Sequence, residues 1–292
     1  MKWEGGKQSE NLQDRRRMGP AGGIAAGGGV MVIIVLILLC MGADPRQLQQ
    51  LLQNAPQAPA RPGGAQVERP ETAEEAHSRE FAATILAFTE EVWGEQFQQA
   101  GQRYEPPQMV LFSDRVLTGC GAAPSAVGPF YCPADKTVYL DPTFFDELER
   151  KLGGSKAEFS QAYVISHEIG HHVQNLLGYS ALVHRKQRAL SKSEGNEWSV
   201  RLELQADYLA GVWAHHGQRK YRFIETGDIE TAITSANAIG DDRLQKRSSG
   251  FVSPESFTHG TSQQRVRWFS LGLKTGDLSR LAEIFEIPYG EL

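Results

Sequence analysis

Residues 163–178 read YVISHEIGHHVQNLLG, and this stretch predicts an amphipathic helix that carries paired histidines. His167 and His171 are four residues apart, so in a helix they project from the same face. An apolar stripe on the opposite face would let the helix bury its back while the histidines face a cleft. Gly178 is expected to end the helix. The stripe consists of Ile165, Ile169, Val173 and Leu176.

The residues from His167 to His171 form the motif HExxH, whose chemistry suits zinc. If these two imidazoles bind zinc together with one carboxylate from elsewhere in the chain, a fourth coordination position stays open for water. Glu168 follows the first histidine and reaches toward that water, so it is the expected general base. His172 is rotated by about 100° from His171 around the helix, off the metal face. We therefore predict a site for one Zn2+ ion on this helix.

A third zinc ligand is expected from the next long helix, within ELQAD at residues 203–207. Glu203 and Asp207 are four residues apart and share a face. If Glu203 binds the metal, Asp207 can accept a hydrogen bond from the far nitrogen of a ligating imidazole and orient it. The alternative is an ordinary exposed acidic pair.

Residues 108–141 differ from the rest, because short apolar runs broken by Gly and Pro indicate a small β-sheet. Peptidases often bind an extended substrate along a sheet edge, which makes one of these runs a candidate substrate strand. The alternative is an ordinary strand of the sheet. The run consists of Thr137, Val138 and Tyr139.

The chain after Pro142 is predicted to be helical, interrupted by a long polar loop over residues 240–258. His259 follows this loop and is the candidate donor to an oxyanion that would develop in a reaction at the zinc site. The alternative is a helix-capping loop, with Thr261 or Ser262 as the N-cap and Arg265 on the surface. Helices are expected over 71–99, 144–152, 156–177, 197–216, 228–238, 262–272 and 277–285.

The N-terminal region carries the features of a membrane anchor. Residues 18–43 contain no charged side chain and are long enough to cross a bilayer. The basic run Arg15–Arg17 precedes them, so the positive-inside rule places the N-terminus in the cytoplasm. A cleaved signal peptide, or a lipoprotein attached at Cys40, is the alternative.

The chain is thus divided into a cytoplasmic basic leader (1–17), a transmembrane anchor (18–43), a flexible linker (44–70) and one exported domain (71–292). This plan places a single-pass protein in the inner membrane with its domain in the periplasm. An exported domain permits disulfides, and Cys120 and Cys132 are expected to pair.

The composition limits the classes of protein that remain. The chain has 292 residues, with 30 Lys+Arg against 35 Asp+Glu and a formal charge of −5. This mild acidity argues against a nucleic-acid-binding protein. An apolar fraction of 40% is sufficient for a packed core, and three cysteines are too few for a disulfide scaffold.

Four segments in combination resemble a bacterial family of neutral zinc metallopeptidases, and more widely the gluzincins, which carry HExxH and a downstream ExxxD. The resemblance covers residues 71–292 and the N-terminal anchor. It implies an α+β, zincin-like fold with a small N-terminal sheet and a mostly helical C-terminal half, preceded by a single transmembrane helix. It also implies the ligands His167, His171 and Glu203, with Glu168 as general base. The segments are FYCPADKTVYLD (130–141), HEIGHH (167–172), ELQAD (203–207) and HGTSQQR (259–265).

We therefore expect a membrane-anchored zinc metallopeptidase that cleaves peptide or protein substrates with a zinc-activated water. One alternative is a non-catalytic, zinc-stabilised interaction protein tethered to the membrane. Glu168 argues against it, because a structural zinc site needs no base and usually closes the fourth position. The other alternative, a zinc hydrolase of non-peptide substrates, stays open.

Overall fold

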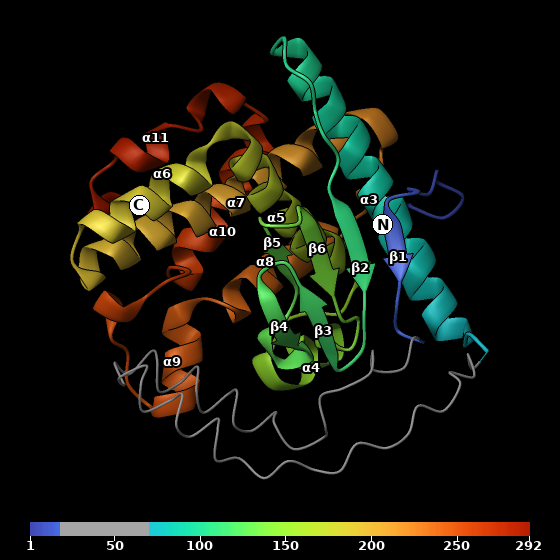
Figure 1. The fold of residues 1–292 in the computed structure, drawn as a ribbon, viewed down its shortest axis with the longest axis horizontal. Helices are drawn as coiled ribbons and strands as arrows, with labels where there is room; N and C mark the ends of the chain where they lie inside the picture. The colour runs from blue at the N-terminus through green and yellow to red at the C-terminus, as the bar shows by residue number, and fades with distance from the viewer. Residues whose placement is uncertain (18–69) are drawn as a thin grey trace. The chain divides into compact units, whose positions relative to one another are not determined.

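The computed structural model describes residues 1–17 and 70–292, which form mostly helices and a few short strands (Figure 1). Residues Met1–Arg15 and Glu71–Leu292 make one compact unit. The three longest helices are α3 (Ala73–Gln99), α5 (Glu158–Leu177) and α7 (Lys192–Tyr221). The shorter ones are α4 (Phe144–Glu147), α6 (Tyr179–Ala189), α8 (Asp228–Ala238), α9 (Asp241–Ser249), α10 (Ser262–Thr275) and α11 (Glu283–Glu286).

A four-stranded sheet has the order β1 (Leu12–Asp14), β2 (Gln108–Leu111), β6 (Thr137–Leu140) and β5 (Phe130–Cys132). Neighbours pair in parallel from β1 to β6, whereas β5 runs antiparallel to β6. Alternate residues of β2 and β6 face the main core, and the residues between them face a second cluster that includes Val116. Val116 belongs to the hairpin of β3 (Arg115–Thr118) and β4 (Gly121–Pro124). Both faces of β6 are therefore covered.

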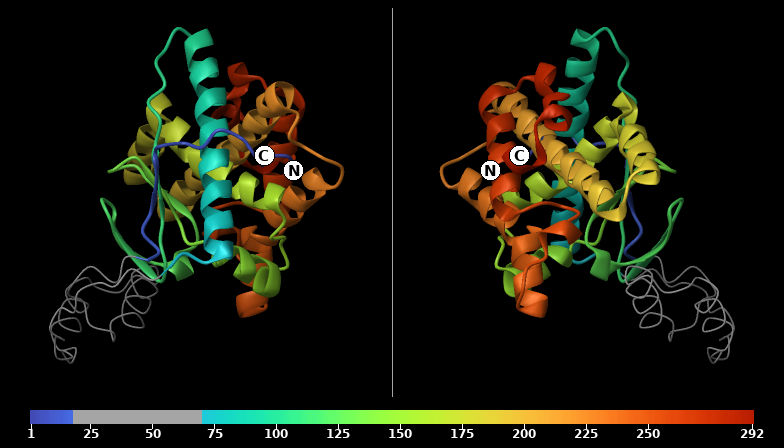
Figure 2. Two further views of the ribbon diagram at one scale, coloured as in Figure 1. Left: turned by 90° about the vertical axis from the view of Figure 1, so that its right-hand side faces the viewer. Right: turned by 90° about the vertical axis from the view of Figure 1, so that its left-hand side faces the viewer.

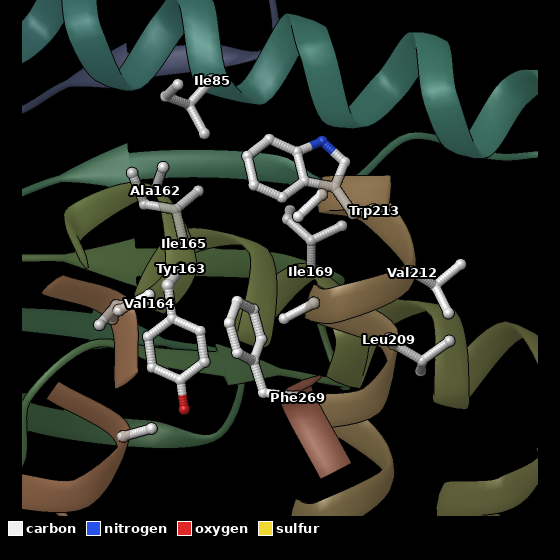
Figure 3. Close-up of a cluster of buried hydrophobic side chains, with 14 of the residues drawn as sticks. Ile85, Ala162, Tyr163, Val164, Ile165, Ile169, Leu209, Val212, Trp213 and Phe269 are labelled. Carbon is white, nitrogen blue, oxygen red and sulfur yellow. The ribbon is translucent and has the colours of Figure 1, made fainter. Parts of the chain in front are cut away.

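Helix α5 lies at the centre of the main core. Figure 3 shows Ile165 and Ile169 of α5 in one cluster with Ile85 of α3 and Trp213 of α7. Both isoleucines are 1% exposed or less, so the apolar stripe buries the back of the helix as the sequence predicted. Gly178 ends the helix in a left-handed conformation with φ of 84°. This packing fixes the direction in which the opposite face of α5 points.

The first residues of the chain belong to the same fold, which the sequence did not predict. Strand β1 pairs with β2, and the N-terminal segment runs beside α3 (Figures 1 and 2). Trp3 is only 6% exposed and packs edge-on against His77 and Phe81 of α3. Residues 1–17 had been expected to form a separate cytoplasmic leader. Strand β1 has only three residues, LQD, and so carries no apolar alternation by which it could have been found.

The predicted fold class and location therefore need correction. The described part is mostly helical with a few strands, not an α+β domain preceded by a transmembrane helix. Within the described ranges, no helix combines the length and apolarity that a bilayer crossing requires. The predicted anchor (18–43) lies outside those ranges, as does the predicted linker (44–70) except for its last residue. A single crossing would also separate β1 from β2, yet these strands share a sheet, so the single-pass inner-membrane arrangement is not supported.

Replacing Trp3 with Ala should test the role of the N-terminal segment in the fold. We expect the free energy of unfolding to fall by about 3 kcal/mol, because a large buried aromatic side chain is lost. Chemical denaturation followed by circular dichroism measures this change. Lys2→Ala is the matched control, since the Lys2 side chain is 71% exposed. Equal stabilities for Trp3→Ala and Lys2→Ala would show that the segment does not contribute to the fold.

Candidate metal centre

Helices α5 and α7 bring His167, His171 and Glu203 to one point. The Nε2 atom of His167 lies 3.3 Å from one Glu203 carboxylate oxygen, and Nε2 of His171 lies 3.5 Å from the other. The potential ligand atoms of the three residues all lie within 4.8 Å of one another. The helices can approach this closely because Gly170 faces Ala206: a Cβ on Gly170 would meet the Ala206 carbonyl oxygen at 3.0 Å.

The hydrogen bonds of the two imidazoles leave the correct nitrogen free for a metal. Nδ1 of His167 donates to Oδ1 of Asp207 at 2.9 Å, since a carboxylate only accepts. Nδ1 of His171 faces Oε1 of Gln174 at 2.9 Å. The amide nitrogen of Gln174 donates to the Leu202 carbonyl at 2.6 Å, which fixes the orientation of that amide. Both Nδ1 atoms thus carry a proton, and both Nε2 atoms face Glu203 and can bind a metal once they have lost theirs. This donor set fits one zinc ion.

A buried network behind His167 holds Asp207 in place. Arg265 of α10 donates to both oxygens of Asp207, from Nε at 2.8 Å and from Nη2 at 3.0 Å. The hydroxyl of Tyr163 donates to Oδ1 of Asp207 at 2.6 Å. Burial opposes ionisation of Asp207, but Arg265 and His167 outweigh it and lower the pKa of that carboxyl to about 2. Asp207 is therefore an anion held by three donors.

Before a metal binds, the carboxylate of Glu203 favours protonation of the two imidazoles, and the imidazoles keep Glu203 ionised. Burial opposes protonation of His171, but Glu203 outweighs it and raises the pKa of His171 to about 9. The pKa of His167 is also raised, because Asp207 and Glu203 outweigh burial. Burial would raise the pKa of Glu203, but the two imidazoles hold it well below its usual range. A bound metal must displace the imidazole protons.

Zinc affinity is therefore expected to depend on pH. Below pH 9 His171 carries a proton that metal binding releases, so affinity should rise by at least about tenfold per pH unit between pH 6 and pH 8, and more steeply where His167 is also protonated. Competition with a chromophoric chelator measures the dissociation constant, once the chelator's own protonation is subtracted. A dissociation constant that stays flat over this range would mean that the metal binds elsewhere.

Glu168 lies beside the ligands in a cavity of ≈ 700 Å3. Its side chain is largely buried, and this burial raises the pKa of its carboxyl, although His171 and His167 act in the opposite direction. The cavity is also lined by His259, by Arg265 and by residues 129–131 at the start of β5. A raised pKa brings the basicity of Glu168 closer to what proton transfer near neutral pH requires.

His259 reaches the cavity from the segment that precedes α10. Its Nδ1 lies 3.2 Å from Oδ1 of Asp241, at the start of α9, and the other Asp241 oxygen accepts the backbone N–H groups of residues 258–260. The hydrogen bond to Asp241 and the charge of Glu203 outweigh burial and raise the pKa of His259. Thr261 caps α10, as one alternative stated, but Arg265 is 3% exposed and not on the surface.

The predicted substrate strand is not at a sheet edge. Thr137, Val138 and Tyr139 lie in β6, which pairs with β2 on one side and β5 on the other. Its backbone groups are therefore already in use. Strand β5 is the edge strand that lines the cavity. Cys132, at the end of β5, is bonded to Cys120 of the β3–β4 turn, so the two cysteines pair as expected.

Sequence reasoning missed several residues of the site. Asp241 lies in helix α9, which occupies part of the predicted polar loop and, with Leu244 as its single apolar residue, shows no apolar period. Tyr163 precedes His167 by four residues, so helical spacing could have placed it on the metal face. Arg265 is the last residue of HGTSQQR, and the sequence predicted no role for it in the site. Only the packing of α10 on α7 shows that it reaches Asp207.

Two imidazoles and a carboxylate, with a glutamate beside them, form the donor set expected of a zinc protein of the HExxH class. A family model described as "Putative neutral zinc metallopeptidase" matches residues 1–283, and the chain belongs to this family. It is 45% identical over 283 residues to "Uncharacterized protein YpfJ" of Escherichia coli K12, covering 95% of this chain and 96% of that one. It is 46% identical over 183 residues to "Uncharacterized protein Rv2575" of Mycobacterium tuberculosis, covering 60% and 61%. No solved structure matches the chain.

Proposed function

We propose that this protein hydrolyses peptide bonds as a zinc-dependent metallopeptidase, with Glu168 as the general base. The observation that carries the proposal is the position of Glu168: it lies next to three converging ligands, it is not one of them, and it faces a cavity large enough for a peptide. A purely structural zinc site would have no use for such a group. Membership of the zinc metallopeptidase family supports the same activity.

The residues of the site divide the chemistry among them. Zinc, when bound by His167, His171 and Glu203, would supply a Lewis acid that activates water and polarises the scissile carbonyl. Glu168 takes a proton from the attacking water and returns it to the leaving amine. His259, oriented by Asp241, donates a hydrogen bond to the developing oxyanion. Its raised pKa favours the protonated, donating form.

The edge strand β5 supplies the means of binding a peptide backbone. No strand among the described residues pairs with the side of β5 opposite β6. An extended substrate can add to that side through backbone hydrogen bonds, which give affinity with little sequence preference. Apolar side chains that line the cavity, among them Phe144, Val164 and Leu244, would accommodate an apolar residue of the substrate.

The proposed activity is tested with the purified full-length protein loaded with one equivalent of zinc. Incubation with a mixed-sequence peptide library, followed by mass spectrometry, should reveal new internal termini. Removing zinc with a chelator should abolish cleavage, and restoring zinc should recover it. A zinc-loaded protein that leaves every peptide intact would contradict the proposal. Hydrolysis of simple esters alone would point instead to a non-peptide hydrolase.

A further inference from the structure

His172 is buried on the side of α5 that turns away from the metal, and both of its ring nitrogens are engaged. Nε2 lies 2.7 Å from the backbone carbonyl of Glu105, and Nδ1 lies 3.0 Å from the hydroxyl of Tyr131. Because a carbonyl only accepts, Nε2 carries the proton and donates it. In a neutral imidazole Nδ1 is then an acceptor. The ring therefore connects the metal helix to two segments of chain that lie outside it.

The hydroxyl of Tyr131 completes this connection. The side-chain amide of Asn175, one turn further along α5, donates to the hydroxyl oxygen at 3.2 Å. The hydroxyl proton is then free to bond to Nδ1 of His172, so the hydroxyl accepts from one residue of α5 and donates to another. The rings of Tyr131 and His172 also meet edge-on, with centroids 5.4 Å apart. Tyr131 is thus held by two residues of α5.

Tyr131 is the central residue of β5, and it lines the same cavity as Glu168. Its backbone also interacts with the Glu168 carboxyl and acts to lower the pKa of that group. The disulfide ties the end of β5 to the β3–β4 turn, not to α5. Besides this contact with Glu168, the Tyr131 hydroxyl is a point at which side chains of the metal helix hold the edge strand.

We infer that His172 and Asn175 are positioning residues: through the Tyr131 hydroxyl they set the place of β5 relative to Glu168 and to an extended substrate. The effect of this positioning on substrate binding rests on the proposed peptidase function, whereas the placement of β5 does not. His172 neither binds the metal nor touches substrate in this role. It acts on the reaction only through Tyr131.

The first test removes one oxygen atom with Tyr131→Phe. Hydrogen–deuterium exchange of the backbone amides of residues 130–132 should quicken at least about fivefold, because a buried hydrogen-bond partner is lost, while residues 109–111 of β2 stay unchanged. Tyr221→Phe is the matched control, since it removes a hydroxyl bonded to Glu91 away from the cavity. Exchange of residues 130–132 that is equal in Tyr131→Phe and wild type would overturn the inference, whether or not the protein cleaves peptides.

The second test separates hydrogen bonding from packing at position 172. His172→Gln keeps one donor and one acceptor, whereas His172→Leu fills the space with neither. The Gln variant should exchange like wild type and the Leu variant like Tyr131→Phe, and the double variant His172→Leu/Tyr131→Phe should be no faster than either single one. Wild-type exchange in His172→Leu would contradict the inference. If His172→Leu does not fold, Tyr131→Phe and His172→Gln still decide the question.

The third test uses the peptide that wild type cleaves fastest in the mixed library. Tyr131→Phe should raise KM for this peptide about tenfold and change kcat less than about threefold, with one zinc per chain retained, because the strand that binds the backbone is loosened. An unchanged KM alongside active wild-type enzyme would reject the effect on substrate binding. Absence of cleavage by wild type would instead reject the proposed function and leave the exchange result to decide the positioning role.

Discussion

Glu168→Gln is expected to lower kcat by about 10³-fold while the protein keeps one bound zinc per chain. Glutamine has the shape of glutamate but cannot accept a proton from the attacking water. Glu168 is not among the three converging ligands, so its charge is not needed to hold the metal. Rates from single-peptide assays, paired with zinc quantification by atomic emission, measure the two quantities.

The matched control is Glu158→Gln, which makes the same chemical change at the start of the same helix, at a residue that does not line the cavity. Its kcat should stay within about twofold of wild type. His167→Ala provides the opposite comparison, because it should lose zinc and activity together. Equal turnover by wild type and Glu168→Gln would exclude Glu168 as the base. Loss of zinc from Glu168→Gln would leave the metal, not the base, as the cause of inactivity.

Arg265→Leu should have the second large effect, because it leaves the Asp207 carboxylate buried without its cation. Breaking a buried ion pair from one side costs about 3–5 kcal/mol of unfolding free energy. Asp207 orients His167, so zinc affinity should also fall by about 10- to 100-fold. Denaturation of the metal-free protein and chelator competition measure the two effects separately.

Arg267→Leu is the control for this change, since Arg267 lies on the same helix but is exposed. It should alter stability by less than about 0.5 kcal/mol and leave zinc affinity unchanged. Arg265→Lys keeps the charge but cannot form the two-pronged contact, and it serves if the Leu variant does not fold. Wild-type zinc affinity in a stably folded Arg265→Lys protein would show that the network does not position His167.

The convergence of the candidate metal ligands could be predicted from sequence because their key spacings are local. In a helix a four-residue interval places two side chains on one face whatever surrounds it, and this applies to His167 and His171 as well as to Glu203 and Asp207. The stripe behind the histidines also indicated which side of α5 would be buried. Helix α8 was predicted with its observed bounds, since a periodic segment is flanked by Gly227 and Gly240.

The prediction for the N-terminal region was wrong because it rested on local properties alone. Hydropathy and charge describe a segment in isolation, and they suggested a leader separated from the domain. The pairing of β1 with β2 and the burial of Trp3 depend on residues more than 70 positions away. No local pattern in a three-residue polar strand reveals such a partner.

The sequence by itself determined which residues could bind zinc and which one could act as base, because the helical repeat decides these neighbours. Only the tertiary structure decided that Arg265 lies behind Asp207, that Asp241 holds His259, and that β5 rather than β6 is the edge beside Glu168. The same holds for His172, whose spacing says only that it leaves the metal face. Its contacts with Tyr131 and Glu105 depend on the packing of a strand and a loop against α5. Packing between distant segments produces no periodic pattern in the sequence.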